Sequence, residues 1–345
     1  MSFSNTFDTT NTGSAVSNRE DLTDVLTILA PEETPVLSSA SKQKASATFA
    51  EWTVDELASP VTTGISEGAD VSTFTDKFSG RARLGNYIQK FRRDYMVSDL
   101  QDAVDSVGPA KIAQAEAKAI RELKRDVEAT LIGTGDAQIE NGAGVPYKMR
   151  GLGKWIQTGA QTDSAPETPE AYRPDAGQVF DISSATPTAF QESDLNNIIS
   201  TIYRHTGSTQ NLTLVADTGL RKTISNFARF VGTGSDFDGN GNASLRNVNY
   251  NGDSTTIKLS VEIYESDFGR VSIVNMNPDT APATLAGGSN FNDGYIVNPE
   301  YYGVHELIPM GSTRLPNLGG GERGYVDCSL TLGVYHPQAH GKIEQ

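Results

Sequence analysis

The stretch that decides the fold is residues 108–133, Gly-Pro-Ala-Lys-Ile-Ala-Gln-Ala-Glu-Ala-Lys-Ala-Ile-Arg-Glu-Leu-Lys-Arg-Asp-Val-Glu-Ala-Thr-Leu-Ile-Gly. Proline at the first helical position and a glycine at each end predict one helix over 109–132. Its apolar side chains recur at helical spacing along one stripe, formed by Ile112, Ile120, Leu123, Val127 and Leu131. At about 1.5 Å per residue the helix is roughly 35 Å long. We expect it to lie across a sheet, with Lys118–Glu122 and Lys124–Glu128 as ion pairs on the solvent side.

Two strand patterns precede this helix. Residues 46–54 and 80–97 carry apolar side chains in weak alternation, and the connection between them is rich in Gly, Ser, Thr and Asp. Together they predict a long hairpin that reaches away from the body and needs another surface to lie on. Residues 1–20 predict a polar arm, followed by a short helix at about Asp21–Leu29 and an extended chain at Pro35.

An α/β unit and a set of closing strands follow the helix. Ser193 is expected to cap a helix that stops near Gly207, and Asp217 to cap another after a buried strand at 212–216. Alternation predicts further strands, at 257–263, 271–276, 295–297, 304–308 and 326–334. Cys328, the single cysteine, falls on an apolar face and is interpreted as a core residue. A lone cysteine excludes an intrachain disulfide and favours a reducing compartment.

Composition limits the class of protein. The 345 residues are 37% hydrophobic and 21% charged, which is ordinary for a globular chain of two lobes or one large mixed domain. The net charge of −15 disfavours a general nucleic-acid-binding role. The polar N-terminus and the short apolar runs lead us to expect neither a signal peptide nor a membrane span.

The charges fall in blocks. Residues 1–60 hold nine acids against three bases, and residues 76–93 hold six bases against Asp76. Such blocks are typical of contacts between segments or subunits, although two solvated faces would give the same pattern. The six bases are Lys77, Arg81, Arg83, Lys90, Arg92 and Arg93.

Three motifs imitate functional sites. The run Gly151–Lys154 lacks the spacing of a phosphate loop, and a turn is the better interpretation. Residues 236–242 match the first half of a calcium loop, but Asn247 occupies the position that needs a glutamate. His336 and His340 have no cysteine or acid nearby in sequence. We therefore predict no catalytic, cofactor-binding or metal-binding residues.

Several short motifs appear in the order of a known family. They are Phe49–Leu57, Glu67–Asp70, Arg83–Lys90, Ala119–Ala129, Tyr264–Gly269, Asn298–Tyr301 and Ala339–Lys342. In this order they resemble the Hong Kong 97 phage fold of tailed-phage major capsid proteins, and in particular the SU-ten-like major head proteins. The resemblance covers nearly the whole chain and implies an α+β fold.

The resemblance also implies a role for each segment. Residues 1–30 would be the N-arm, 31–45 a connection and 46–95 an extended loop that lies over a neighbouring subunit. Residues 96–189 would be the peripheral domain with its spine helix at 109–132, residues 190–288 the axial α/β domain, and residues 289–345 the closing peripheral strands. Candidate contacts between subunits are Trp52, Arg81, Arg83, Lys90, Arg92 and Arg93.

The implied partners are further copies of this chain, in hexamers and pentamers, which enclose double-stranded DNA without reading its sequence. The short arm favours a separate scaffolding protein, and a portal and a decoration protein are further expected partners. No lysine crosslink is predicted, since Lys77 and Lys90 have no identifiable acceptor. The protein would belong to the virion and assemble in the host bacterial cytoplasm, with no membrane partner.

Two other classes of protein stay open on the sequence alone. A surface adhesin or glycan-binding β-rich protein would suit the Thr/Asn/Gly-rich loops and the acidity, but the long helix argues against it. An enzyme would need an acid–base or metal constellation, and none is recognisable. Electron microscopy separates the three classes, because only a capsid protein forms shells.

Overall fold

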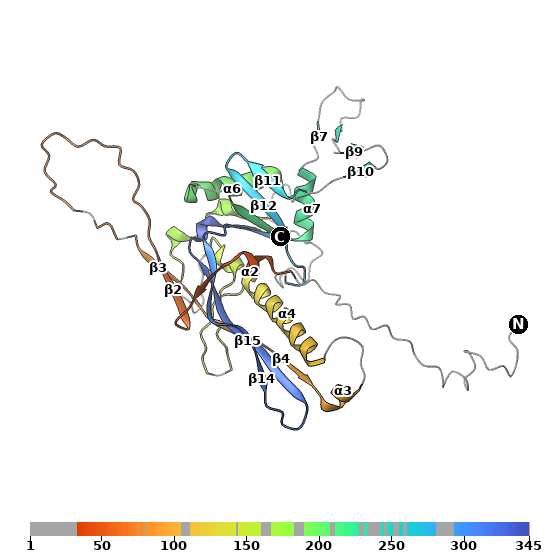
Figure 1. Ribbon diagram of the computed structural model, residues 1–345. Helices are drawn as coiled ribbons and strands as arrows, with labels where there is room; N and C mark the ends of the chain where they lie inside the picture. Colours follow the sequence, from red (N-terminus) through yellow and green to blue (C-terminus); the bar gives the residue numbers. More distant parts are fainter. Residues whose placement is uncertain are drawn as a thin grey trace, which may run out of the picture.

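The computed structural model describes residues 33–74, 76–78, 80–104, 111–142, 144–159, 167–182, 190–207, 211–227, 231–232, 243–244, 248–250, 255–257, 261–280 and 293–344. In this part of the chain, two sheets have buried apolar cores (Figure 1). The hairpin of residues 49–87, called the arm from here on, extends from the body. The four-stranded sheet has the order β1 (Ser41–Lys44), β14 (Tyr302–Leu315), β15 (Glu322–Val334), β4 (Gln89–Val97). The six-stranded sheet has the order β11 (Ile263–Ser266), β12 (Gly269–Asn275), β6 (Leu212–Ala216), β13 (Gly294–Val297), β16 (Gly341–Glu344), β5 (Val179–Asp181).

The shorter elements connect these sheets or lie beside them. They are α3 (Asp99–Ala103), α5 (Leu152–Trp155), η1 (Glu170–Tyr172), η2 (Ala176–Gln178), η3 (Pro337–Ala339), β7 (Val231–Gly232), β8 (Ala243–Ser244), β9 (Val248–Tyr250) and β10 (Thr255–Ile257). The mixture of helix and strand is the α+β content expected from the sequence. Residues 236–242 and 245–247 of the calcium-like motif and the short helix predicted at 21–29 lie outside the described residues.

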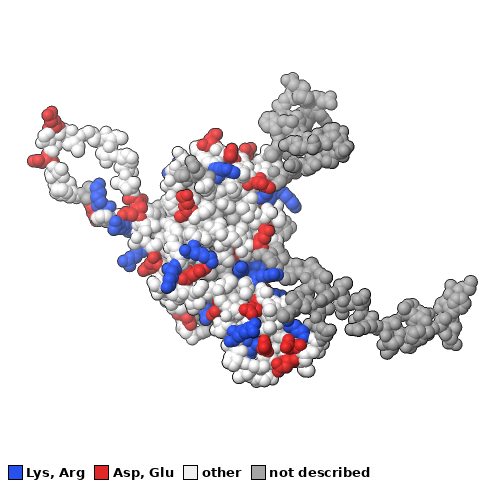
Figure 2. Space-filling view, in the orientation of Figure 1, with Lys and Arg blue, Asp and Glu red and all other residues white. Residues whose placement is uncertain are grey.

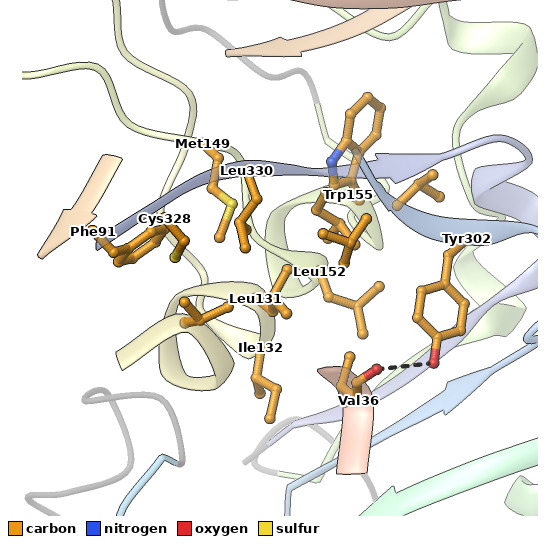
Figure 3. Close-up of a cluster of buried hydrophobic side chains, with 14 of the residues drawn as sticks. Val36, Phe91, Leu131, Ile132, Met149, Leu152, Trp155, Tyr302, Cys328 and Leu330 are labelled. Atoms are coloured by element: carbon orange, nitrogen blue, oxygen red, sulfur yellow. Dashed lines mark hydrogen bonds between the residues drawn. The ribbon is translucent and has the colours of Figure 1, made fainter. Parts of the chain in front are cut away.

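The long helix, α4 (Lys111–Ile132), packs its apolar stripe on β4 and β15, as predicted. Ala119, Leu123, Val127 and Leu131 are buried, because the stripe faces the sheet. Figure 3 shows this core, where Cys328 lies beside Phe91. Cys328 is 1% exposed, which confirms its interpretation as a core residue. The predicted helix start at Gly108 and Pro109 is outside the described residues.

Helices α6 (Glu192–Thr206) and α7 (Thr218–Phe227) pack against the six-stranded sheet. Gln191, not Ser193, is the cap of α6, because its backbone N–H donates to the Asp194 carboxylate at 2.9 Å. Gly207 ends α6 in the left-handed conformation, as predicted, and Asp217 precedes α7. The strand predicted at 257–263 is instead two strands, β10 and β11, which pair with different partners.

A buried carboxylate joins α4 to the N-terminal end of the described chain. Both oxygens of Glu128 accept backbone N–H groups at 2.8 Å, one from Val36 and one from Leu37, in helix α2 (Pro35–Ser39). The predicted Lys124–Glu128 pair is therefore wrong, whereas Lys118–Glu122 is present at 3.8 Å. The extended chain predicted at Pro35 is also wrong, since proline is well suited to the first helical turn.

The second predicted long strand, 80–97, is divided at Ile88. Its first half is β3 (Ala82–Tyr87), which pairs with β2 (Phe49–Val54) to form the foot of the arm. Its second half is β4, which pairs with β15 in the four-stranded sheet. The arm therefore projects directly from the edge of the core that carries α4.

A buried asparagine fixes the foot of the arm to the body. Asn86, on β3, is 0% exposed. Its side-chain amide donates to the carbonyl oxygens of Arg150 and Leu332 at 3.0 and 2.8 Å, and its oxygen accepts the Arg150 backbone N–H at 2.7 Å. Hydrogen bonds are directional, so these three set the angle at which β3 leaves the body.

Asn86→Ala should loosen this attachment. The substitution leaves the Arg150 N–H and two carbonyl groups buried without partners, which costs about 1–3 kcal/mol of folding free energy. Urea unfolding of the purified chain measures the change. Thr62→Ala on the exposed arm is the matched control and should leave stability unchanged. Equal stability of the two variants would contradict the assignment of Asn86 as an anchor.

Glu128 should make stability depend on pH. Burial raises its pKa above the ordinary 4.5, and the two N–H donors oppose the shift only in part. A carboxyl whose pKa is raised by folding binds its proton more tightly in the folded state, so its contribution is complete below pH 4.5 and is lost as pH rises through the raised pKa. Glu128→Gln cannot ionise and removes this dependence.

We therefore expect the stability of Glu128→Gln relative to the native chain to increase as pH rises above 4.5. Denaturant unfolding at a series of pH values measures this difference. Glu128→Ala is the comparison variant. It leaves the backbone N–H groups of Val36 and Leu37 unpaired, which lowers the free energy of unfolding by about 1–3 kcal/mol for each group. A pH-independent difference between Glu128→Gln and the native chain would contradict the raised pKa.

Candidate intersubunit surfaces

The arm exposes large apolar side chains that the chain itself does not cover. Beyond β2 and β3 its described residues form no strand, and Figure 2 shows that most of its surface is uncharged. Leu57, Ile65 and Phe74 are 97%, 87% and 87% exposed. Val61, Val71 and Phe78 are also exposed. Apolar groups gathered in this way on a projecting segment are typical of a surface that a partner covers.

The foot of this arm packs on aromatic side chains of the body. The Trp52 ring lies 5.7 Å from that of Trp155, 5.9 Å from that of His305 and 5.8 Å from that of Tyr335. Such aromatic contacts and the burial of the ring area hold β2 on the body. Trp52, a candidate intersubunit contact, thus packs partly buried on its own chain, and its contact with a neighbouring subunit stays a prediction.

The base of the loop beyond β2 and β3 is attached as well. The Tyr172 hydroxyl donates to the carbonyl oxygen of Gly80. Arg81 donates to the Asp55 carboxylate at 2.8 Å across the hairpin, and its guanidinium lies 4.2 Å from the centre of the Phe78 ring. Arg81 therefore closes the base of the loop, and the loop beyond it is left to contact other surfaces.

The remaining candidate bases divide into two groups. Lys90 pairs with Asp327 at 3.2 Å, and Arg93 binds the Asp126 carboxylate through two hydrogen bonds of 2.6 and 2.7 Å. Arg83 and Arg92 are exposed and form no ion pair within the described residues. Of the candidate bases, these two are therefore the ones available to a partner.

A second exposed apolar group lies at the turn between β14 and β15. Leu315 and Met96 lie on either side of Arg323 in one row across the sheet, and both are exposed. Leu318 in the turn and Leu100 on α3 are 78% and 81% exposed. The sequence reasoning did not select this surface, although the run Leu315-Pro-Asn-Leu-Gly-Gly-Gly321 marks a turn with apolar residues beside it.

The described residues show few features of a chemical centre. No group of three or more His, Cys, Asp or Glu among them is arranged to hold a metal ion. No described helix is long and apolar enough to cross a membrane. Burial raises the pKa of the Cys328 thiol to about 12, so the thiolate needed for nucleophilic chemistry is disfavoured.

Solved structures show the same fold. The Cyanophage A-1(L) capsid matches with a TM-score of 0.60 and 14% identity, over 97% of this chain and 98% of that one. The capsid of Cyanophage P-SCSP1u matches with 0.58 and 13% identity, over 96% and 93%. The SrpI encapsulin of Synechococcus elongatus PCC 7942 matches with 0.50 and 12% identity, over 96% and 93%. No curated protein sequence matches this chain.

The fold alone does not separate a phage capsid protein from an encapsulin, because both match this chain. The family match does separate them. The sequence profile of the SU10 major capsid protein family matches residues 4–345, nearly the whole chain. Nothing in the comparisons supports the adhesin alternative. The chain therefore belongs to the SU10 major capsid protein family, has the Hong Kong 97 phage fold and is a shell-forming protein of a phage virion.

Proposed function

We propose that this chain assembles into hexamers and pentamers that close an icosahedral shell around double-stranded DNA, and that it catalyses no reaction. The exposed apolar arm carries the proposal, because a lone subunit leaves six large apolar side chains in water. Covering each of them contributes about 1.5–3 kcal/mol, and the gain is repeated at every contact of a closed shell.

The domain roles are part of the same proposal. Residues 1–30 act as the N-arm, 31–45 as a connection and 46–95 as the extended loop that covers a neighbouring subunit. Residues 96–189 and 289–345 form the peripheral domain around α4, and residues 190–288 form the axial domain. The six-stranded sheet supports an axial domain that is larger than residues 190–288. Strands β5, β13 and β16 belong to that sheet but lie outside this range in sequence.

The proposed partners follow from charge and from the assembly. A chain of net charge −15 does not neutralise packaged DNA, so mobile cations balance the phosphates. A separate scaffolding protein directs assembly in the host cytoplasm, a portal occupies one vertex and a decoration protein binds the outer surface. None of these partners requires the chain to recognise a DNA sequence.

Electron microscopy of the purified chain tests the proposal, and shells or capsomers are the expected result. The triple variant Val61→Asp/Ile65→Asp/Phe74→Asp places carboxylates on the arm and should abolish assembly, because a buried unpaired charge opposes association. The folded body should stay intact, since all three side chains are exposed.

The matched control is Thr62→Asp/Ser66→Asp/Ser72→Asp, which adds the same charge to exposed polar positions of the same arm. It should retain assembly. Normal particles from the apolar-to-acid variant, or loss of particles from both variants, would contradict the role of the apolar arm.

Arg83 and Arg92 should set the register between subunits by pairing with carboxylates of a neighbour. Arg83→Glu/Arg92→Glu should give particles that dissociate at lower temperature and lower salt, since each exposed ion pair contributes only about 0–1 kcal/mol but recurs over the shell. Light scattering during heating at a series of salt concentrations measures this change. Particles as resistant as those of the native chain would show that both side chains face solvent.

A further inference from the structure

Strand β4 lies at the edge of its sheet, and its outer side has no strand partner among the described residues. β15 pairs with the other side along the whole strand. At the start of β4, the Gln89 side chain accepts the Met149 N–H, so a loop lies beside the first residues. No described loop forms a backbone hydrogen bond with residues 91–97. Alternate residues of this stretch therefore present N–H and C=O groups that no strand pairs with.

β4 is the longest of the four edge strands in the two large sheets. β1 and β11 have four residues each and β5 has three, whereas β4 has nine. Proteins often keep edge strands short, because a long edge pairs readily with another chain. Residues 91–97 alone span about 23 Å at about 3.3 Å per residue. An edge of this length is suited to the addition of a strand from a partner.

The loop of the arm, residues 57–74, contains one segment with the composition of such a strand. Gly and Pro divide this loop into runs, and the longest is 69–74, Ala-Asp-Val-Ser-Thr-Phe. Val, Thr and Phe favour strands. All six residues are exposed, and none of them lies in a strand. The segment therefore has strand-forming residues but no strand partner within the described part of its own chain.

The side chains on the outer face of β4 limit which strand can lie beside it. Arg93 binds Asp126 of α4 and thus points toward the helix. Because neighbours in a strand alternate, Arg92, Asp94 and Met96 point to the opposite face. All three are exposed, and Arg92 forms no ion pair within the described residues. A matching strand carries an acid and an apolar side chain on one face, four residues apart.

One parallel register gives the arm segment such a face. Residues two apart in a strand share a face, as 70, 72 and 74 of the segment do. Three pairs of side chains then become neighbours: Asp70 with Arg92, Ser72 with Asp94, and Phe74 with Met96. The first pair joins opposite charges, the second lets a hydroxyl donate to a carboxylate, and the third sets a ring against a sulfur. An antiparallel strand that keeps the first pair would carry Phe74 past the start of β4.

Given the proposed assembly into a shell, on which this inference rests, we infer that residues 69–74 of one copy add to the outer side of β4 of a neighbouring copy as a parallel strand. In Figure 1 the arm and the α3 end of β4 project from the body in different directions, which assigns the two to different copies. A contact between unlike surfaces of two copies closes into a ring when it is repeated. Ser72→Asp in the polar control of the assembly experiment adds a single like-charge pair at an exposed edge, so that control still assembles.

Cysteine crosslinking of assembled particles tests the register. In Ser72→Cys/Asp94→Cys the two substituted residues are direct neighbours, and adjacent strands place their Cα atoms within the reach of a disulfide, about 4.4–6.8 Å. Diamide takes up the two electrons and two protons of each thiol pair. Covalent oligomers on a non-reducing gel are the expected result. The native Cys328 is 1% exposed and does not compete.

Thr73→Cys/Asp94→Cys is the matched control and should lose the crosslink, because residue 73 lies on the other face of the segment. Equal crosslinking of both pairs would overturn the register, and intact particles without crosslinks from either pair would overturn the contact. Disulfides confined to single chains would overturn the assignment to a neighbour. Dimers from Asp94→Cys alone would assign the edge to β4 of a second copy instead.

Hydrogen exchange of the native chain tests the same contact without a cysteine. Residues 91–97 should exchange more slowly in particles than in the unassembled Val61→Asp/Ile65→Asp/Phe74→Asp variant, since their outward N–H groups gain acceptors. The β1 edge is the control and should exchange equally in both samples. Unchanged exchange of 91–97, or equal slowing of both edges, would overturn the strand pairing. Absence of particles from the native chain would overturn the proposed function, and this contact with it.

Discussion

The burial of one side of α4 against β4 and β15 is the constraint on which the rest of this structure depends. The stripe through Leu123, Val127 and Leu131 excludes water from the largest core. Once the helix lies there, its other side chains have fixed positions over the sheet. Asp126 then faces Arg93 on β4, and Glu128 faces the backbone of α2. The positions of β4 and α2 are thus both fixed by contacts with α4.

Much of the fold could be predicted because many elements bury one side against one neighbour. The period of α4 and the alternation along β15 appear within a single stretch of sequence. The partner of each strand could not be predicted in this way, because strand pairing depends on residues far apart in sequence. The parallel pairing of Ser41 with Gly303 leaves no local pattern. The division of the predicted strand 80–97 likewise reflects two partners and not a change in residue type.

The surfaces were harder to predict than the fold. Glu128 follows Lys124 by four residues, which is the pattern of a solvent-exposed ion pair, and only the packing of α2 makes it a buried acceptor. Trp52 is large and aromatic, as interface residues often are, and the sequence did not show that its ring packs, partly buried, on aromatic rings of its own chain. Asn86 carried a signal, because asparagine is unfavourable within strands and calls for a special reason there. The sequence showed that basic residues cluster in 76–93, but it did not show which carboxylates pair with Arg81, Lys90 and Arg93.

The attachment of the arm at Asn86 has a mechanical consequence. The loop beyond β2 and β3 extends roughly 40 Å if half of its residues are stretched out. A lever of that length converts a tilt of a few degrees at the foot into a displacement of several ångströms at the tip. Packed apolar side chains tolerate much smaller errors, since interiors are as dense as organic crystals. Three directional hydrogen bonds at a fully buried side chain give the foot the angular accuracy that such a lever demands.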